Sequence, residues 1–284
     1  MTTSRALGVT VVGASSGDLS HHTAGKLFVR RCVNPREALR DASADVIVLC
    51  SSLRDRSYWL QEVAGAGKHA MCAPPLSASF RRLQRLTRLY ADAGLRLACF
   101  SDAGVPALSR WLATREHYGR TGAILYLRLR VSIPRSELEE DPEGVLLRYG
   151  VPYLALLGRF GSVDAVLARA RSLVSNRPTE DVAIGLLRFS TGIEATVEFN
   201  GLGSTYGVTA EFYGRLGHTS FAQKRKGGCS SLLEQITDFT SRIDDDRRAL
   251  SDVEAITRGH HLAGWMLKSA RFDRELNKRE VQLD

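Results

Sequence analysis

The sequence lacks the features that mark a membrane protein or a secreted protein. No apolar stretch in its 284 residues approaches the roughly 20 residues that a membrane span requires. The first residues, MTTSRALGVTVVGA, carry a single Arg and have neither the apolar segment nor the small-residue cleavage site of a signal peptide. We therefore expect a cytoplasmic protein without a membrane partner.

Cysteine and histidine are poorly spaced for a metal site or a disulfide. The five cysteines form no CxxC pair, and zinc sites depend on such spacing. His21-His22 and His260-His261 are adjacent pairs, and neighbouring side chains on one helix or strand point in different directions. We expect no bound metal, and we interpret the cysteines in apolar runs as small buried hydrophobes.

Aromatic residues are also few, at 7% of the chain, although the net charge is +8. A positive charge suggests nucleic-acid binding, but the basic residues are spread along the chain, with no interleaved aromatics and no known reader motif. Solvated helix faces explain such a distribution, and an anionic small-molecule substrate fits it as well. We expect a small, anionic substrate and no nucleic acid.

The first 119 residues alternate between strand and helix patterns. Strand patterns occur at 8–14, 45–50, 69–72 and 95–100, and helix patterns at 35–42, 54–65 and 77–93. This alternation implies a parallel sheet with helices on both faces. We predict an α/β, Rossmann-like domain over residues 1–119.

The remaining residues, 120–284, have a different pattern. Residues 123–133 alternate, with arginines on one face and leucine and valine on the other. Further strand patterns occur at 163–172, 181–189, 193–199 and 207–213, and helix patterns at 151–160, 232–242 and 252–276. Long strands beside few helices predict an α+β domain with a large, open, mostly antiparallel sheet, and the last helices should pack back on the first domain. We expect the open face to join two copies in a homodimer.

Three segments resemble the Gfo/Idh/MocA family of sugar and amino-acid-derivative oxidoreductases. AGAGKHAMCAPPL (64–76) is similar to AGKHVLCEKPL of family members, and EGVLLRYGVPYLALLGRFG (143–161) to DLGVHYIDLLRYLLG. AEFYGRLGHTSF (210–221) is similar to EIYGTKGSL. The resemblance covers nearly the whole chain and implies a truncated Rossmann-like domain followed by the family's sheet domain.

The chain resembles a divergent member, because it departs from the family's catalytic pattern. Members carry a Lys in EKP beside the nicotinamide, where this chain has Ala-Pro-Pro at 73–75. The Asp and His of the second-domain helix correspond to Arg148 and Pro152, and a later Asp corresponds to Ala155. Oxidation of an alcohol needs a base for the hydroxyl proton. None of these replacements accepts a proton near neutral pH.

The cofactor pattern is degenerate as well. A dinucleotide fold uses G-x-G-x-x-G so that the pyrophosphate can approach a helix N-terminus, and only the first Gly of GASSGD (13–18) fits. Residues 15–26 occupy the space where members have a helix and a second strand. We therefore expect no cofactor, with NAD(P) as the alternative. The residues that would contact it, as vestigial positions, are Gly13, Ser15, Ser16, Ser51 and Ser52.

Polar residues line the cleft that this fold would form. Ser51 and Ser52 end a strand at the carboxyl edge, where open α/β sheets bind ligands. A Tyr–Arg–Asp set can hold a carboxylate and transfer a proton. The residues that we expect to carry the chemistry are Arg148 for the substrate anion and Tyr149, Tyr153 and Asp102 for proton transfer. Several of these residues also have a simpler structural interpretation. Ser51 and Ser52 could cap the following helix, Asp102 could be a turn residue, and Tyr153 could be part of the core.

Three functions remain open at this point. The one we favour from the sequence is a family-like protein repurposed for non-redox chemistry on a small anionic substrate, such as cyclisation, isomerisation or elimination. The first alternative is an NAD(P)-dependent oxidoreductase with an atypical site, which the fold alone would support by analogy. The second alternative is a catalytically silent, dimeric binding or accessory subunit.

Overall fold

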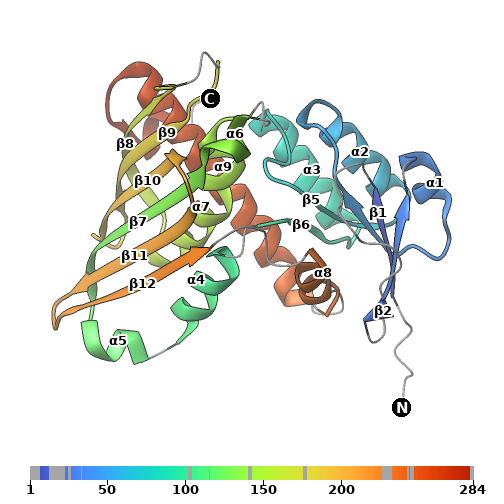
Figure 1. Cartoon of the computed structure of the whole chain (residues 1–284), viewed down its shortest axis with the longest axis horizontal. Helices are drawn as coiled ribbons and strands as arrows, with labels where there is room; N and C mark the ends of the chain where they lie inside the picture. The colour runs from blue at the N-terminus through green and yellow to red at the C-terminus, as the bar shows by residue number, and fades with distance from the viewer. Residues whose placement is uncertain are drawn as a thin grey trace. The chain divides into compact units, whose positions relative to one another are not determined.

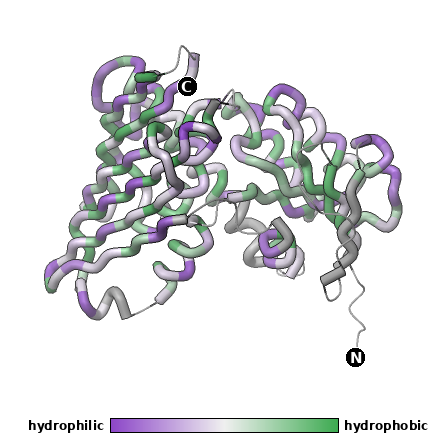
Figure 2. Tube along the Cα trace, viewed as in Figure 1, coloured by the Kyte–Doolittle hydropathy of each residue, from purple (hydrophilic) through white to green (hydrophobic). Residues whose placement is uncertain are grey.

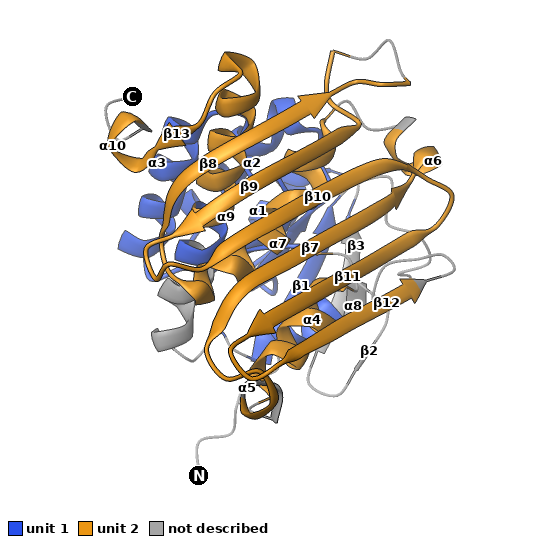
Figure 3. Ribbon diagram, turned by 90° about the vertical axis from the view of Figure 1, so that its left-hand side faces the viewer, with its two compact units in different colours: residues 1–100, 231–257 blue, residues 101–230, 258–284 orange. Residues whose placement is uncertain are grey.

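The structure is a computed structural model in which two compact units can be described. Unit 1 comprises residues 1–100 and 231–257, and unit 2 comprises residues 101–230 and 258–284 (Figure 3). The described residues are 7–12, 23–24, 27–32, 34–101, 104–114, 116–139, 143–174, 178–225, 232–241, 243 and 246–281. The domain boundary between residues 119 and 120 stays a prediction.

Unit 1 is built on a sheet with the strand order β2-β3-β1-β4-β5-β6 (Figure 1). Its strands are β1 (Leu7–Val12), β2 (Thr23–Ala24), β3 (Leu27–Cys32), β4 (Val46–Leu49), β5 (His69–Cys72) and β6 (Leu97–Cys99). Its helices are α1 (Pro35–Arg40), α2 (Leu53–Gly65), α3 (Phe80–Asp92) and α8 (Leu232–Ser241). Every neighbouring pair is parallel except β2 with β3.

Hydrophobic clusters lie on both faces of this sheet. Ile47 of β4 shares one buried cluster with Leu60 of α2 and Leu86 of α3. Val46, its neighbour in the strand, belongs to a second cluster with Ile236 of α8. Successive strand residues point to opposite faces, so a run that is apolar throughout, such as 46–50, has to be buried on both sides. Figure 2 shows hydrophobic stretches in the strands of unit 1.

A buried tyrosine joins two of the covering helices. The Tyr90 hydroxyl of α3 donates a hydrogen bond to the Leu60 carbonyl of α2 at 2.8 Å. Burial raises the pKa of Tyr90 above its ordinary value, so the phenol keeps the proton that it donates.

The first crossover of unit 1 is short. β3 lies directly beside β1, in parallel register from Leu7↔Leu27 to Val12↔Cys32. Only residues 13–26 connect the two strands, whereas a complete helix with a further strand and loops would need more residues than that. The truncated Rossmann-like sheet that we predicted is confirmed.

Unit 2 is built on a sheet with the strand order β12-β11-β7-β10-β9-β8-β13. Its strands are β7 (Ile124–Pro134), β8 (Val163–Arg171), β9 (Val182–Phe189), β10 (Glu194–Gly203), β11 (Tyr206–Gly214), β12 (His218–Arg225) and β13 (Leu276–Asn277). Its helices are α4 (Gly104–Ala113), α5 (Glu116–Thr121), α6 (Arg135–Glu139), α7 (Val151–Leu157), α10 (Lys278–Val281), a π-helical turn (Leu146–Gly150) and a 3-10 turn (Gly158–Phe160). The long helix α9 (Asp246–Phe272) runs from unit 1 into unit 2. β7 and β10 are parallel, and the other pairs are antiparallel.

One face of this second sheet packs against helices. Leu129 of β7, Phe199 of β10 and Tyr153 of α7 belong to the same buried cluster as Met266 of α9. The opposite face is turned to the viewer in Figure 3, and the helices of unit 2 lie behind the sheet in that view. Hydrophilic and hydrophobic residues alternate along its strands (Figure 2). The open, mostly antiparallel sheet that we predicted is confirmed.

Several elements differ from the sequence prediction. The acidic segment 132–144 contains helix α6, which is not among the predicted helices. The last predicted helix, 252–276, ends at Phe272, because the buried Leu276 instead pairs with Val166 as an edge strand. β3, β12, α4 and α5 were missed. Among the described residues, every helix is too short or too polar to cross a membrane.

Candidate functional site

Four parallel strands of unit 1 end together at one edge of the sheet. The final residues of these strands are in register with their neighbours: Val12, Leu49, Cys72 and Cys99. Ligands of open α/β sheets bind outside the carboxyl ends of the strands. The segments that follow β4 and β5 are therefore the described part of a candidate binding edge.

Ser51 brings a buried hydroxyl to this edge. It follows β4, and its side-chain oxygen is enclosed without a hydrogen-bond partner among the described residues. A buried polar group that makes no hydrogen bond costs about 1–3 kcal/mol, and native proteins retain few of them. The hydroxyl can supply one donor and two acceptor positions to a bound polar group.

Ser52 begins helix α2 but does not cap it. Its hydroxyl donates to the Asp55 carboxylate at 3.0 Å and makes no side-chain hydrogen bond to the first backbone N–H groups of the helix. The side chain of Ser52 therefore does not act as the helix cap that the simpler interpretation assumed. The N-terminal amides of a helix carry partial positive charge and favour phosphate or hydroxyl oxygens. They complement the Ser51 hydroxyl on the same edge.

Arg56, which the sequence did not single out, connects the two loops of the edge. Its Nη2 donates to the Ser51 carbonyl at 2.9 Å, and its Nη1 donates to the Pro75 carbonyl at 2.5 Å. The side chain is buried, although that of Arg54, two positions earlier, is exposed. In the sequence both arginines look like solvated helix residues, so only the structure identifies Arg56 as a positioning residue.

The loop after β5 holds no group for proton transfer. Ala73 is half-buried, and Pro74 and Pro75 are buried and joined by a cis peptide bond. Where family members have EKP, the loop after β5 therefore presents only the apolar side chains of Ala73, Pro74 and Pro75. A proton-transfer group has to come from another part of the chain.

Four of the predicted site residues cannot be placed. Gly13, Ser15, Ser16 and Asp102 lie outside the described residues. Their assignments to cofactor binding and proton transfer stay predictions.

In unit 2, Arg148 and Tyr149 lie side by side on the π-helical turn that precedes α7. Both side chains are half-buried, and the Arg148 guanidinium lies 5.9 Å from the centre of the Tyr149 ring. Single π-helical turns inside α-helices occur frequently at functional sites. The turn presents a cation and a phenol from adjacent positions.

The same turn is anchored by Glu180. The Glu180 carboxylate accepts from the Leu146 backbone N–H at 3.0 Å, and the Glu180 carbonyl accepts from the Val145 N–H. A Cβ on Gly144 would overlap that carboxylate, so a larger residue there would displace the Glu180 side chain. These bonds fix the backbone that carries Arg148.

Glu137 of α6 is a further residue that the sequence did not single out. The Tyr149 hydroxyl points to its carboxylate at 3.5 Å, at the outer limit of a hydrogen bond. A carboxylate beside a phenol can receive or return the phenol proton. The acidic composition of 132–144 was visible in the sequence, but the helix that turns Glu137 towards Tyr149 was not.

Tyr153 lies one turn further along, in the core. Its side chain is fully buried, and its hydroxyl shares a hydrogen bond with the Tyr206 hydroxyl. Arg148, Tyr149 and Glu137 are thus grouped within unit 2, while Tyr153 is directed to a different partner. The role of Tyr153 in proton transfer stays a prediction.

A Rossmann-like unit combined with a unit of one large, mostly antiparallel sheet is the fold of the Gfo/Idh/MocA-type dehydrogenases, and this chain has that fold with a short first crossover. This confirms, at the level of the fold, the resemblance seen in the sequence. No protein-family model matches the chain, and no curated protein matches it in sequence.

Solved structures match the fold over nearly the whole chain. A probable dehydrogenase from Thermotoga maritima has a TM-score of 0.82 at 17% identity, covering 97% of this chain and 100% of its own. GenD2 from gentamicin A biosynthesis, in complex with NAD, has a TM-score of 0.79 at 15% identity, covering 96% and 97%. The WlbA dehydrogenase from Chromobacterium violaceum, in complex with NADH and UDP-GlcNAcA, has a TM-score of 0.77 at 17% identity, covering 97% and 96%.

These structures correct two expectations. The expectation of no cofactor is wrong, because proteins with this fold over their whole length hold NAD or NADH. That expectation gave the missing glycines and the short crossover more weight than the carboxyl edge of the sheet, which the chain has kept. The favoured non-redox function also finds no support, and the alternative of an NAD(P)-dependent oxidoreductase is the one that agrees with these structures.

Proposed function

We propose that the protein is an NAD(P)-dependent oxidoreductase that acts on a hydroxyl or carbonyl group of a small, polar, sugar-like substrate. The observation that carries this proposal is the whole-length fold match to dehydrogenases that hold NAD or NADH. A cytoplasmic location is part of the proposal.

The carboxyl edge of unit 1 is the proposed cofactor site. The buried Ser51 hydroxyl, which has no partner in the described part of the chain, and the start of α2, which has no side-chain cap, are polar groups that a dinucleotide can use. Arg56 holds the loops after β4 and β5 in place through their carbonyls. When bound, the nicotinamide supplies hydride acceptance or donation.

Arg148 is the proposed residue for a negatively charged group of the substrate. A guanidinium offers two parallel N–H donors to a carboxylate or phosphate, and it stays charged at all accessible pH values. Its place on an anchored turn limits the geometries that it can adopt. This fits an anionic substrate, such as a sugar acid or a sugar phosphate.

Tyr149 and Glu137 are the proposed proton-transfer groups. The phenol can exchange a proton with the reacting oxygen of the substrate while the Glu137 carboxylate accepts the hydrogen bond of the phenol. This pair would supply the proton acceptor that oxidation of an alcohol needs.

The function is tested by incubating the purified protein with NAD⁺ or NADP⁺ and a panel of sugar acids, sugar phosphates and inositols. We expect the absorbance of reduced nicotinamide to rise with at least one anionic member of the panel. If no member is oxidised, and no corresponding ketone is oxidised back through NADH or NADPH, the oxidoreductase proposal is wrong.

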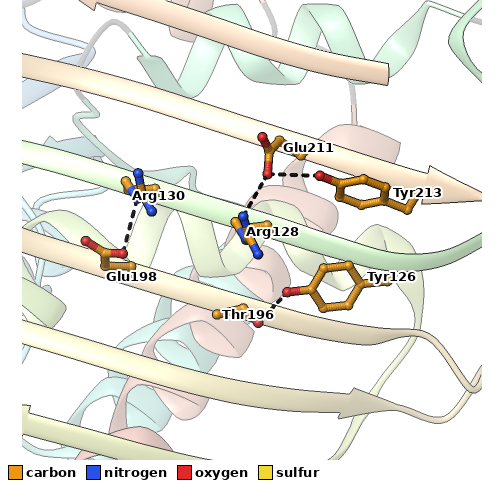
Figure 4. Close-up of polar contacts among 7 residues, drawn as sticks. All are labelled: Tyr126, Arg128, Arg130, Thr196, Glu198, Glu211 and Tyr213. Atoms are coloured by element: carbon orange, nitrogen blue, oxygen red, sulfur yellow. Dashed lines mark hydrogen bonds and ion pairs between the residues drawn. The ribbon is translucent and has the colours of Figure 1, made fainter. Parts of the chain in front are cut away.

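We also propose a homodimer through the open face of the unit 2 sheet. Ion pairs join side chains of neighbouring strands on this face: Arg128 pairs with Glu211 at 3.4 Å, and Arg130 pairs with Glu198 at 3.1 Å (Figure 4). The register places the exposed Ile184 and Leu186 of β9 beside them on this face. A mixed charged and apolar sheet face resembles the surface of a protein–protein interface.

The dimer is tested by light scattering. The wild-type protein should have about twice the chain mass of 31.2 kDa, and Leu186→Lys should shift it towards the monomer, because the ammonium would be buried in the interface. Leu216→Lys, which changes an exposed leucine in the turn between β11 and β12, is the matched control and should remain dimeric. A wild-type protein that is entirely monomeric at micromolar concentration contradicts the proposal.

A further inference from the structure

Unit 2 contains a cavity that the proposed function does not use. It has a volume of about 150 Å³ and lies between the end of α7, the start of β8, the middle of α9 and α10. Its lining includes Leu154 and Gly158, whereas Arg148 and Tyr149 do not contribute to it. An apolar cavity of similar size in another protein accepts benzene, so this one has room for a compact organic molecule.

The floor of the cavity is apolar. Leu154, Leu262 and Trp265 are buried, and Val163 is half-buried beside them. Gly158 lies in the wall beside Arg258, whose side chain would meet a Cβ at that position. Such a surface favours the apolar body of a ligand over a fully hydrated inorganic ion.

The rim of the cavity is positively charged. Arg258 and Lys278 are both exposed and both line the opening, and none of the residues that line the cavity carries a carboxylate. Lys278 reaches the Ser162 hydroxyl at 3.5 Å, which keeps its ammonium at the rim. Two cations at the mouth of an apolar cavity attract a single negative charge.

The nearest acidic residue along α10 is engaged elsewhere. The Glu280 carboxylate accepts from the Asn277 N–H at 2.9 Å and from the Arg274 guanidinium at 2.6 Å. The backbone bond from Asn277, together with Arg274, holds the pKa of Glu280 below its ordinary value. Glu280 is thus a charged partner of Arg274.

His261 adds a neutral polar wall. Its Nε2 accepts from the Trp265 indole N–H at 3.0 Å, which leaves the ring proton on Nδ1. Burial lowers the pKa of His261, in the direction of the neutral form. Among the residues that line the cavity, Arg258 and Lys278 therefore carry the charge near pH 7.

We propose that this cavity binds a small organic carboxylate with a compact apolar body, about the size of benzoate. The body would fill the space over Leu262 and Trp265, and the carboxylate would lie at the rim between Arg258 and Lys278. This ligand site is separate from the proposed cofactor and substrate residues, so it stands or falls independently of the oxidoreductase proposal.

Benzoate is the probe, and the indole N–H signal of Trp265 in a ¹H–¹⁵N spectrum is the readout. The chain has three tryptophans, and Trp265→Phe assigns the signal. Benzoate should shift this signal saturably, with a Kd of about 1 mM for a ligand of this size, while the signals of Trp59 and Trp111 stay in place. Benzyl alcohol, which has the same shape without the charge, should bind about threefold to tenfold more weakly.

Rim variants test the charge. Arg258→Met and Lys278→Met should each raise the benzoate Kd about threefold to tenfold, because exposed cations are partly screened. Arg271→Met removes an exposed arginine further along α9 that does not line the cavity, and it should leave the Kd unchanged. A Trp265 signal that benzoate does not shift, or a Kd that neither rim variant alters, overturns the proposal.

Discussion

Arg56→Met is expected to lower the free energy of unfolding by about 3–5 kcal/mol, from two lost charged hydrogen bonds and two carbonyls left without their donor. In the folded protein this guanidinium donates to the carbonyls of Ser51 and Pro75. Methionine has a similar length but offers no donor, so the loops after β4 and β5 would lose their connection. Urea denaturation, read as the shift in midpoint at unchanged slope, measures the effect.

Two further variants separate the Arg56 contacts from the general cost of changing α2. Arg54→Met alters an exposed arginine two positions earlier and should change stability by less than about 0.5 kcal/mol. Arg56→Lys keeps the charge but cannot donate to both carbonyls as the two Nη groups of arginine do. The stability of this variant should therefore lie between those of the wild type and Arg56→Met. If Arg56→Met unfolds at the wild-type urea concentration, Arg56 does not hold the edge together.

Arg148→Met is expected to lower kcat/KM for the anionic substrate about tenfold to a hundredfold, corresponding to one lost charged hydrogen bond. The affinity for NADH or NADPH should not change, because Arg148 is assigned to the substrate and not to the cofactor. Steady-state kinetics together with a cofactor titration of the same variant separate the two effects.

Arg159→Met is the matched control for Arg148, since Arg159 is an exposed arginine in the same helical segment. It should keep wild-type kcat/KM and wild-type stability. A folded Arg148→Met variant with full activity would mean that Arg148 is only a structural replacement for the family's acidic residue. The substrate anion would then need another partner in the protein.

The sheet of unit 1 was readable from its sequence because burial on both faces leaves a clear apolar run. Residues 45–50 contain β4, and 69–72 coincide with β5. β3 was harder to see, because its sequence LFVRRC places two arginines in a strand. Its assignment depends on pairing with β1, a contact between distant residues that local patterns do not contain.

The candidate site was only partly predictable. The positions of Ser51 and Arg148 followed from a strand end and from the resemblance to the family. The fork of Arg56, the anchoring of the π-helical turn by Glu180, and the approach of Tyr149 to Glu137 all join residues from separate elements. The sequence shows that these residues are polar, but only the folded chain shows which partner each one has. The cofactor was misjudged because the missing glycines and the short crossover were given more weight than the sheet edge, which the sequence had also indicated.

The central proposal is that this sheet edge binds a nicotinamide dinucleotide, and a calorimetric titration of the purified protein with NADH and with NADPH tests it most directly. We expect saturable binding of at least one of them, with a Kd of about 1 µM to 1 mM, the range in which enzymes commonly bind their substrates. Ser51→Ala, which removes the hydroxyl that has no partner among the described residues, should weaken that binding. The absence of binding for both nucleotides at several millimolar, in a protein that is folded by circular dichroism, would contradict the proposal.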